Sequence, residues 1–281
     1  MSTIAQTFQS FLSSLELTSK QRGDANRQHI NLRTQLQQRM SVKDNFLSGS
    51  YARKTAIRPL DDIDVFVVLE PKPGFDVTVP VATILGEIKR VLDEIFPNKS
   101  ALSQNRSVNL SFSGTKIAYD VVPAFLLRPG VYQVPDRETG RWVKTNPKVH
   151  ATLSTEANER AGKKLKPLIK AIKYANAHHR KPARSFQLEV LSWKILETDP
   201  GAYFEGLVTL LQGLAARIDD RCMDPANLGP DIRPEPARLR AAQEWLVKMA
   251  QLATEAKAAE DAKRTSDAHA KLKQIFGPAW R

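Results

Sequence analysis

The sequence predicts an α+β protein in which a lobe built around a mixed sheet is followed by an α-helical lobe. Strand-like runs broken by turn residues occupy the chain from about Val42 to Val143, and helical periodicity dominates after Asn146. With 281 residues, 42% of them hydrophobic, the chain is long enough for two lobes with cores. The expected divisions are N-terminal helices packing on the core over 1–40, the sheet lobe over 41–145 and the helical lobe over 146–281.

The strands of the first lobe are expected where β-rich or alternating segments lie between turn residues. Apolar residues at helical spacing predict helices over Thr3–Leu17 and Val79–Phe96, and a polar helix is expected over Ser19–Met40. One strand should end at Pro123, because proline donates no hydrogen bond to a neighbouring strand. The expected strands are Asn45–Ser48, Asp62–Leu69, Ser107–Phe112, Ile117–Val122 and a hairpin of Tyr132–Val134 with Trp142–Lys144.

The second lobe is expected to consist of helices, with Trp193 in its core and Trp280 packed back onto it. The pair His178-His179 is expected at a helix C-terminus, where positive charge opposes the helix dipole. A ligand site is expected in the cleft between the two lobes, a common position for one. The expected helices are Thr152–Arg160, Lys163–His178, Phe186–Glu197, Phe204–Ile218 and Pro236–Lys263.

The chain has 42 Lys and Arg against 30 Asp and Glu, a net charge of +12. This balance fits polyanionic partners, and it fits a soluble surface that is merely basic equally well. The single cysteine, Cys222, can form neither an intramolecular disulfide nor a zinc site by itself. No apolar run approaches the roughly 20 residues of a membrane helix, and the N-terminus lacks the features of a signal peptide. These observations predict a cytoplasmic protein without membrane contact.

Two aspartates at the start of a strand-like run are the first candidate for chemistry. Asp62 and Asp64 are two residues apart, so in a strand their carboxylates project from the same face and repel each other. Oxygen ligands of this kind suit Mg²⁺ or Mn²⁺. The alternative is a chance Asp-x-Asp at a strand start, which is common.

A glycine turn lies upstream of these aspartates. Gly49 permits close approach of the backbone, and Ser50 offers a hydroxyl and an amide to an anion. A Gly-Ser pair is by itself usually a plain turn. Its place before the paired aspartates suggests that one site could hold both a phosphate and its metal.

Asp120 is the third carboxylate, at the end of the apolar-flanked segment Ile117–Val122. Burying an unpaired carboxylate is costly, so its place in a strand needs a reason. Either it lies at an edge or in a salt bridge, or it is a third metal ligand that helps to deprotonate an attacking hydroxyl.

Together, Gly49-Ser50, Asp62-Ile63-Asp64 and Asp120 resemble the DNA polymerase β-type nucleotidyltransferase superfamily. Within it, the chain is similar to the cGAS/DncV-like nucleotidyltransferases (CD-NTases) of bacterial anti-phage (CBASS) systems. The resemblance covers about Phe46 to Ile232. It is carried by the segments GSYARKTAIRPLDDIDVFVVL, YQVPDRETGRWVKTNP, LKPLIKAIKYAN, SFQLEVL and MDPANLGPDI.

The resemblance implies a role for each matching residue. Asp62 and Asp64 would bind two divalent metal ions, Mg²⁺ or Mn²⁺, and Asp120 the ion nearer the acceptor hydroxyl. The nucleotide-binding residues that it implies are Gly49 and Ser50 at the donor triphosphate, Lys173 and Ser185 at phosphate, and Phe186 stacked on the donor base. From the sequence alone, a solvated helix face is the more common position for a lysine such as Lys173, and Phe186 fits plain core.

The resemblance also implies an activity: synthesis of a cyclic di- or trinucleotide second messenger from ribonucleoside triphosphates, with release of pyrophosphate. It implies regulatory proteins encoded in the same operon as partners. The sequence shows no separate RNA-binding domain, so nucleic acid is not expected to be required. An enzyme that extends RNA or makes linear oligoadenylate would share every catalytic residue and is the alternative. A third possibility, an inactive nucleic-acid sensor, is disfavoured by the intact Asp62, Asp64 and Asp120.

Overall fold

The computed structural model describes residues 3–60 and 62–281, which form two compact units. A sheet unit comprises Leu17–Ala151 together with Ala226–Gly229. A helical unit comprises the chain up to Glu16, Thr152–Pro225 and Pro230–Arg281. Each unit is described by itself.

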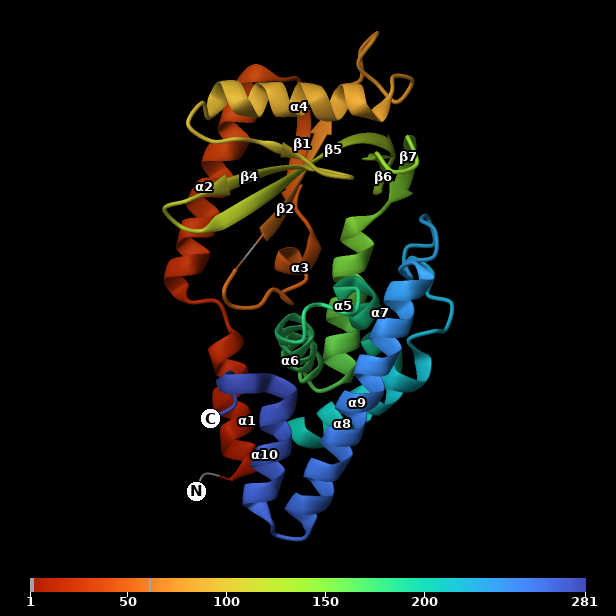
Figure 1. The fold of residues 1–281 in the computed structure, drawn as a ribbon. Coiled ribbons are helices and arrows are strands. Elements are labelled where there is room, and N and C mark those ends of the chain that lie inside the picture. Colours follow the sequence, from red (N-terminus) through yellow and green to blue (C-terminus); the bar gives the residue numbers. More distant parts are fainter. Residues whose placement is uncertain (1–2, 61) are drawn as a thin grey trace. The chain divides into compact units, whose positions relative to one another are not determined.

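The described strands of the sheet unit form one mixed sheet in the order β1-β2-β5-β4-β3, with β6 paired to β5 and β7 to β6 (Figure 1). The β2–β5 pair is parallel, and the other pairs are antiparallel. The strands are β1 (Val42–Leu47), β2 (Asp62–Leu69), β3 (Leu102–Ser103), β4 (Val108–Phe112), β5 (Ile117–Arg128), β6 (Val131–Asp136) and β7 (Arg141–Thr145). The mixed sheet and the β6–β7 hairpin are as predicted.

The expectation that a strand ends at Pro123 is wrong, because β5 continues to Arg128. On the side of β5 away from β2, β4 pairs as far as Val121 and β6 pairs from Phe125. Pro123 lies between these two partners, where no neighbouring strand needs its missing N–H. The proline is therefore accommodated inside the strand.

The two faces of the sheet have different coverings. Helices α2 (Ser19–Arg39) and α4 (Val81–Ile95) pack on the face that carries Ile63, Val65 and Tyr119. The opposite face carries the smaller cluster of Phe66, Val68, Val122, Ala124, Tyr132 and Val134. Residues of a strand alternate between faces, so every second residue of β2 and β5 lies away from α2 and α4.

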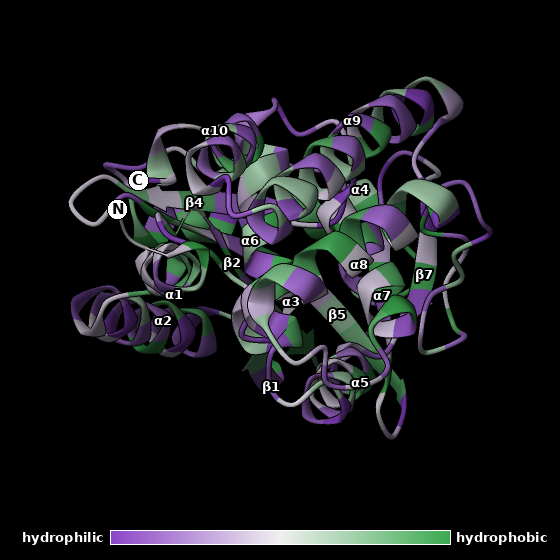
Figure 2. Ribbon diagram, turned by 90° about the horizontal axis from the view of Figure 1, so that it is seen from below, coloured by the Kyte–Doolittle hydropathy of each residue, from purple (hydrophilic) through white to green (hydrophobic). Residues whose placement is uncertain are grey.

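Helix α2 is long but presents few apolar residues to the core, and it is largely hydrophilic in Figure 2. A capping box of Thr18 and Gln21 fixes its N-terminus. Its attachment to the sheet is partly polar, since the Tyr119 hydroxyl donates to the carbonyl of Ala25 at 2.7 Å. This bond joins β5 to α2 on the face of the sheet that α2 covers.

The helical unit surrounds a separate core. Its helix α10 was not expected from the sequence, and α5 begins five residues before the expected Thr152. The helix that ends at His178 does so as predicted. The helices are α1 (Ile4–Leu15), α5 (Pro147–Arg160), α6 (Leu165–His178), α7 (Ser185–Ile195), α8 (Tyr203–Arg217), α9 (Pro236–Asp261) and α10 (Thr265–Phe276), followed by the 3-10 turn η1 (Gly277–Ala279).

The two N-terminal helices belong to different units. The apolar stripe of α1 packs into the core of the helical unit, where Phe8 and Phe11 contact Phe276 and Trp280. Trp280 is buried, and its Nε1 donates to His269 Nδ1 at 3.1 Å. The compact units therefore divide the chain after Glu16 rather than near residue 40, because the apolar faces of α1 and α2 find different cores.

Among the described residues, no helix combines the length and apolar character that crossing a bilayer requires.

Candidate active site

The parallel pairing of β2 with β5 places Asp64 directly beside Asp120. Asp62 lies two residues before Asp64 on β2, so the three aspartates share one face of the sheet. This is the face away from α2 and α4, since the neighbouring residues Ile63, Val65 and Tyr119 belong to the other face. Asp62 is exposed, whereas Asp64 and Asp120 are half-buried. The sheet register thus gathers the three carboxylates predicted from the sequence.

The carboxyl group of Asp64 has a strongly raised pKa. Burial, and then repulsion from Asp120 and Asp62, raise its pKa from 3.8 to about 6. The guanidinium of Arg53 opposes this rise with a smaller effect. Repulsion of this kind requires the three carboxylates to be close together, and a bound cation would relieve it.

Asp120 is held by hydrogen bonds from β4. Burial raises its pKa, while hydrogen bonds from Asn109 and Ser107 oppose the rise. Asn109 lies directly opposite Asp120, and its Nδ2 donates to Asp120 Oδ1 at 2.8 Å. The Ser111 hydroxyl donates to Asn109 Oδ1 at 3.3 Å, which orients the amide. These bonds hold one carboxylate oxygen of Asp120 in place.

The glycine turn lies against Asp64. Gly49 has a φ of +59°, a backbone conformation that favours glycine. A Cβ added at this position would also overlap the Asp64 carboxylate, so both the backbone and the packing require glycine. The amide of Ser48 donates to the Asp64 carbonyl at 2.8 Å. The carbonyl of Ser50, in the short helix α3 (Gly49–Ala52), accepts from the amides of Thr55 and Ala56 at 2.9 and 3.1 Å. The turn is therefore fixed beside the aspartates, as the sequence predicted.

Sequence reasoning missed two residues of this site. Arg53 is buried and lowers the pKa of Asp64, and its signal in the sequence was only its nearness to Gly49. Asn109 had a clearer signal, because Asn109 and Ser111 alternate with apolar residues of β4 and so share one face. An amide on that face has a reason to be there once Asp120 is recognised as its neighbour.

The donor set suits a hard divalent cation, because it consists of carboxylate oxygens whose mutual repulsion contributes to the raised pKa values of Asp64 and Asp120. Within residues 3–60 and 62–281, however, no three acidic, histidine or cysteine side chains are arranged as ready metal ligands. The chemistry of Asp62, Asp64 and Asp120 therefore fits Mg²⁺ or Mn²⁺. Their joint ligation of two ions stays a prediction.

The other predicted nucleotide-binding residues lie in the helical unit. Lys173 on α6 is not on a solvated face, so that alternative is wrong: its side chain is 10% exposed, and its Nζ lies 3.2 Å from Glu189 Oε1. Ser185 is the first residue of α7, a helix whose N-cap, Arg184, makes no side-chain capping bond. Phe186 is partly buried and stands edge-on to Trp193, with ring centroids 6.3 Å apart. Nucleotide binding by these residues stays a prediction.

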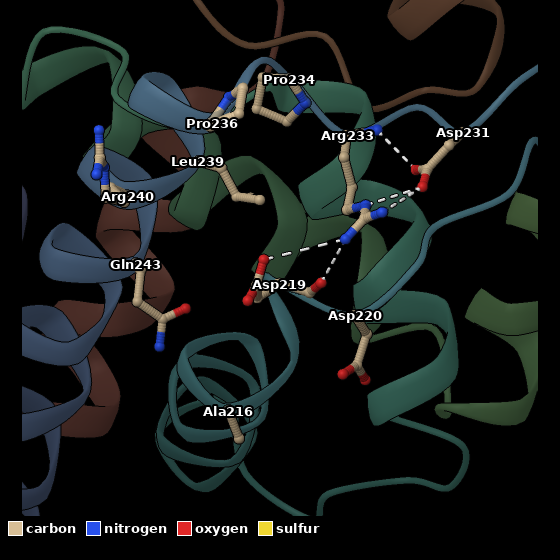
Figure 3. Close-up of a pocket in the computed structure, with 10 residues that line it drawn as sticks. All are labelled: Ala216, Asp219, Asp220, Asp231, Arg233, Pro234, Pro236, Leu239, Arg240 and Gln243. Atoms are coloured by element: carbon tan, nitrogen blue, oxygen red, sulfur yellow. Dashed lines mark hydrogen bonds and ion pairs between the residues drawn. The ribbon is translucent and has the colours of Figure 1, made fainter.

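A hollow of about 970 Å³ also lies in the helical unit, between the end of α8 and the start of α9 (Figure 3). None of the predicted site residues is among the ten that line it. Its Arg233 is already bound, since Nε donates to Asp231 Oδ2 and Nη1 to the Asp219 carbonyl, each at 2.8 Å. The hollow therefore does not contain Asp62, Asp64 or Asp120. The chemistry of these three carboxylates makes them the better candidate for the active site.

The fold is that of polymerase β-like nucleotidyltransferases, as predicted. The chain superposes on CdnC of E. coli MS115-1, in its complex with HORMA-deltaN, with a TM-score of 0.78 and 21% identity, covering 99% of this chain and 98% of that one. It superposes on Vibrio cholerae DncV cyclic AMP-GMP synthase, in complex with the linear intermediate 5′ pppA(3′,5′)pG, with a TM-score of 0.68 and 17% identity. That match covers 85% of this chain and 69% of that one.

The particular family follows from the sequence match. Residues 1–158 match the family described as SMODS, the Second Messenger Oligonucleotide or Dinucleotide Synthetase domain, and the chain belongs to this family. It is 29% identical over 225 residues to the cyclic AMP-AMP-AMP synthase of Acinetobacter sp., a match that covers 75% of this chain. The match spans 64% of the length of that relative. The predicted membership of the CD-NTase family is confirmed.

Proposed function

We propose that this chain joins ribonucleoside triphosphates into a cyclic oligonucleotide and releases pyrophosphate at each step. The observation that carries the proposal is the β2–β5 register, which sets Asp64 beside Asp120 and next to the Gly49 turn. Membership of the second-messenger synthetase family and the name of the Acinetobacter relative support it.

The chemistry is a nucleotidyl transfer. A ribose hydroxyl of one nucleotide loses its proton and forms a bond to the α-phosphorus of another, while the bond to the bridging oxygen breaks and pyrophosphate leaves. Asp120 is the proposed acceptor of the proton, at the carboxylate oxygen that Asn109 does not bind. Bound Mg²⁺ or Mn²⁺ would lower the pKa of the hydroxyl and stabilise charge on the leaving oxygens. Asp62, Asp64 and Asp120 would hold the ions.

Recognition of the nucleotide is proposed for both units. In the sheet unit, the fixed backbone of the turn brings Gly49 and the Ser50 hydroxyl to the triphosphate. In the helical unit, Lys173 and Ser185 contact phosphate, and Phe186 stacks on the base. These assignments match the roles implied by the resemblance of the sequence.

Cyclisation is preferred over extension of RNA or synthesis of linear oligoadenylate. The family to which the chain belongs is named for second-messenger synthesis. The DncV cyclic AMP-GMP synthase was solved in complex with a linear intermediate, which supports two successive transfers at one centre. Ring size and base identity are properties of the product and need to be measured directly.

A role in anti-phage defence and a regulatory protein partner are also proposed. CdnC was solved in complex with a HORMA protein, which supports regulation of this chain by a protein partner encoded beside it. Binding of a co-expressed neighbour protein that changes the synthesis rate would support the partner.

The deciding experiment is incubation with all four labelled ribonucleoside triphosphates and Mg²⁺ or Mn²⁺, followed by phosphatase treatment and mass spectrometry. A product that resists phosphatase and has the mass of a cyclic di- or trinucleotide is expected. The double variant Asp62→Asn with Asp64→Asn is the control for contaminating activity. A product that phosphatase degrades would favour the linear alternative.

A further inference from the structure

The ion pair between Lys173 and Glu189 is buried in an unusual way. The side chain of Glu189 is 1% exposed and that of Lys173 10%, with Nζ and Oε1 3.2 Å apart. A buried ion pair contributes little net stability compared with apolar residues of similar size, because both charges lose their hydration. The pair therefore calls for an explanation other than stability.

The position of Glu189 on α7 supplies an explanation for the buried ion pair. Glu189 follows Ser185 by four residues, so the two lie on the same face of the helix, one turn apart. An ammonium group bonded to Glu189 is thus held beside the face of α7 that begins with Ser185. The carboxylate is the deeper of the two partners, and the lysine side chain retains the exposure.

The link between α6 and α7 is fixed at a second point. Asn176, one turn after Lys173, donates from Nδ2 to the carbonyl of Ala183, and its Oδ1 accepts from the amide of Ala183, both at 3.0 Å. Both residues are buried. The start of α7 is therefore bound to α6 by a double hydrogen bond, which leaves the lysine little freedom relative to Ser185.

We propose that Glu189 is a positioning residue that holds the Lys173 ammonium beside Ser185, ready to bind the phosphates of the nucleotide. The inference rests on the proposed function, in which Lys173 contacts phosphate. A free lysine side chain loses rotamer freedom when it binds an anion, and this loss of entropy weakens binding. A lysine that a carboxylate already holds has lost this freedom before the anion binds, so the entropy lost on binding is smaller. The ammonium group has three donors, so it can bind Glu189 and a phosphate oxygen at the same time.

The test is calorimetric titration of the full chain with α,β-methylene ATP, an analogue that cannot release pyrophosphate. The variants are Glu189→Gln, Lys173→Met and the two combined. Each single variant is expected to weaken binding by about 10-fold, the effect of one charge-assisted hydrogen bond. The double variant should bind no more weakly than Lys173→Met, because Glu189 acts through the lysine. In turnover assays Glu189→Gln should raise KM and leave kcat within about 2-fold.

Glu16→Gln is the matched control. Glu16 pairs with Lys170, which lies on α6 like Lys173, but Glu16 itself lies at the end of α1 and not on α7. The Glu16→Gln variant should bind the analogue like the wild type. If Lys173→Met also binds like the wild type, the proposed phosphate contact itself is wrong. If only Lys173→Met weakens binding, or if Glu189→Gln weakens it equally in the Lys173→Met background, the positioning role is wrong while the proposed function stands.

Glu189→Asp keeps the negative charge but shortens the reach to Lys173, and it serves if Glu189→Gln does not fold. It should bind the analogue more weakly than the wild type and more tightly than Lys173→Met. Wild-type affinity in a folded Glu189→Asp protein would overturn the inference, because the position of the carboxylate would then not matter.

Discussion

The sheet unit and the helical unit both bury carboxylates, but they treat the charge differently. Glu189 in the helical unit has an ammonium group 3.2 Å away. Asp64 in the sheet unit has Arg53 as its attractive partner, and repulsion from Asp120 and from Asp62 each exceeds that attraction. A carboxylate with its counter-charge in place can position a neighbour. Carboxylates that repel one another are an unfavourable arrangement that is suited to a cation supplied with the substrate.

The strongest test of this comparison removes the repelling charges. Asp62→Asn combined with Asp64→Asn should reduce product formation by on the order of 10³-fold or more, because the charges that hold cation and nucleotide are gone. Product measured by mass spectrometry, with far-UV circular dichroism to confirm folding, provides the check. Synthesis at the wild-type rate in the folded double variant would refute the assignment of these residues.

Gly49 tests whether the position of the charge matters as much as its presence. Gly49→Ala places a Cβ where the Asp64 carboxylate lies and forces a φ of +59° on alanine. Displacement of Asp64 should lower the synthesis rate by about 10²-fold. Gly140→Ala is a matched control, since Gly140 also has a positive φ but has no atom within 4 Å of an added Cβ. Equal losses in the two variants would mean that backbone strain alone accounts for the effect.

Burial of Asp64, together with repulsion from Asp120 and Asp62, predicts a pH-dependent stability of the metal-free protein. The folded pKa of Asp64, about 6, exceeds its ordinary value of 3.8, so the protonated form favours folding. This stabilisation is complete below pH 3.8, is lost as the pH rises to about 6 and stays lost above it. Asp64→Asn should therefore gain about 2 kcal/mol over the wild type at pH 8 and little at pH 4. Urea unfolding in the presence of a chelator measures both. An equal gain at the two pH values would contradict the raised pKa of Asp64.

The smallest effect is expected at a neutral contact. Ser50→Ala removes one hydroxyl from the turn and should weaken binding of α,β-methylene ATP by about 5-fold, the effect of a single neutral hydrogen bond. Ser113→Ala, at a turn of the same unit, is the control. Unchanged affinity in Ser50→Ala would leave only the backbone of the turn as a phosphate contact.

Local patterns were enough to predict most of the sheet unit. The alternation of β4 and the apolar run of β2 gave strands close to their observed bounds, and the i, i+2 spacing placed Asp62 and Asp64 on one face. The proximity of Asp64 and Asp120 could not be derived from such patterns, because it depends on strand order and register. It was available only through the resemblance to a family.

The remaining differences have non-local causes. The prediction of a strand end at Pro123 fails because the sequence does not show that the pairing of β4 with β5 ends before it and that of β6 begins after it. Glu189 was assigned no role because a glutamate within a helix is ordinary, and its burial and its partner on α6 become visible only in three dimensions. The assignment of α1 to the helical core likewise depends on packing against Phe276 and Trp280 at the far end of the chain.

The parallel β2–β5 pair also has a consequence for how the protein comes to be active. Between these strands the chain passes through α4, β3 and β4 before it returns, so the pairing closes a long loop. Such contacts form late and slowly, because the entropy of closing the loop is lost before the strand pairing compensates for it. Asp64 and Asp120 are neighbours only after that closure. A chain still emerging from the ribosome, or one misfolded in this lobe, therefore has no assembled carboxylate site, and completion of the fold is itself a condition for activity.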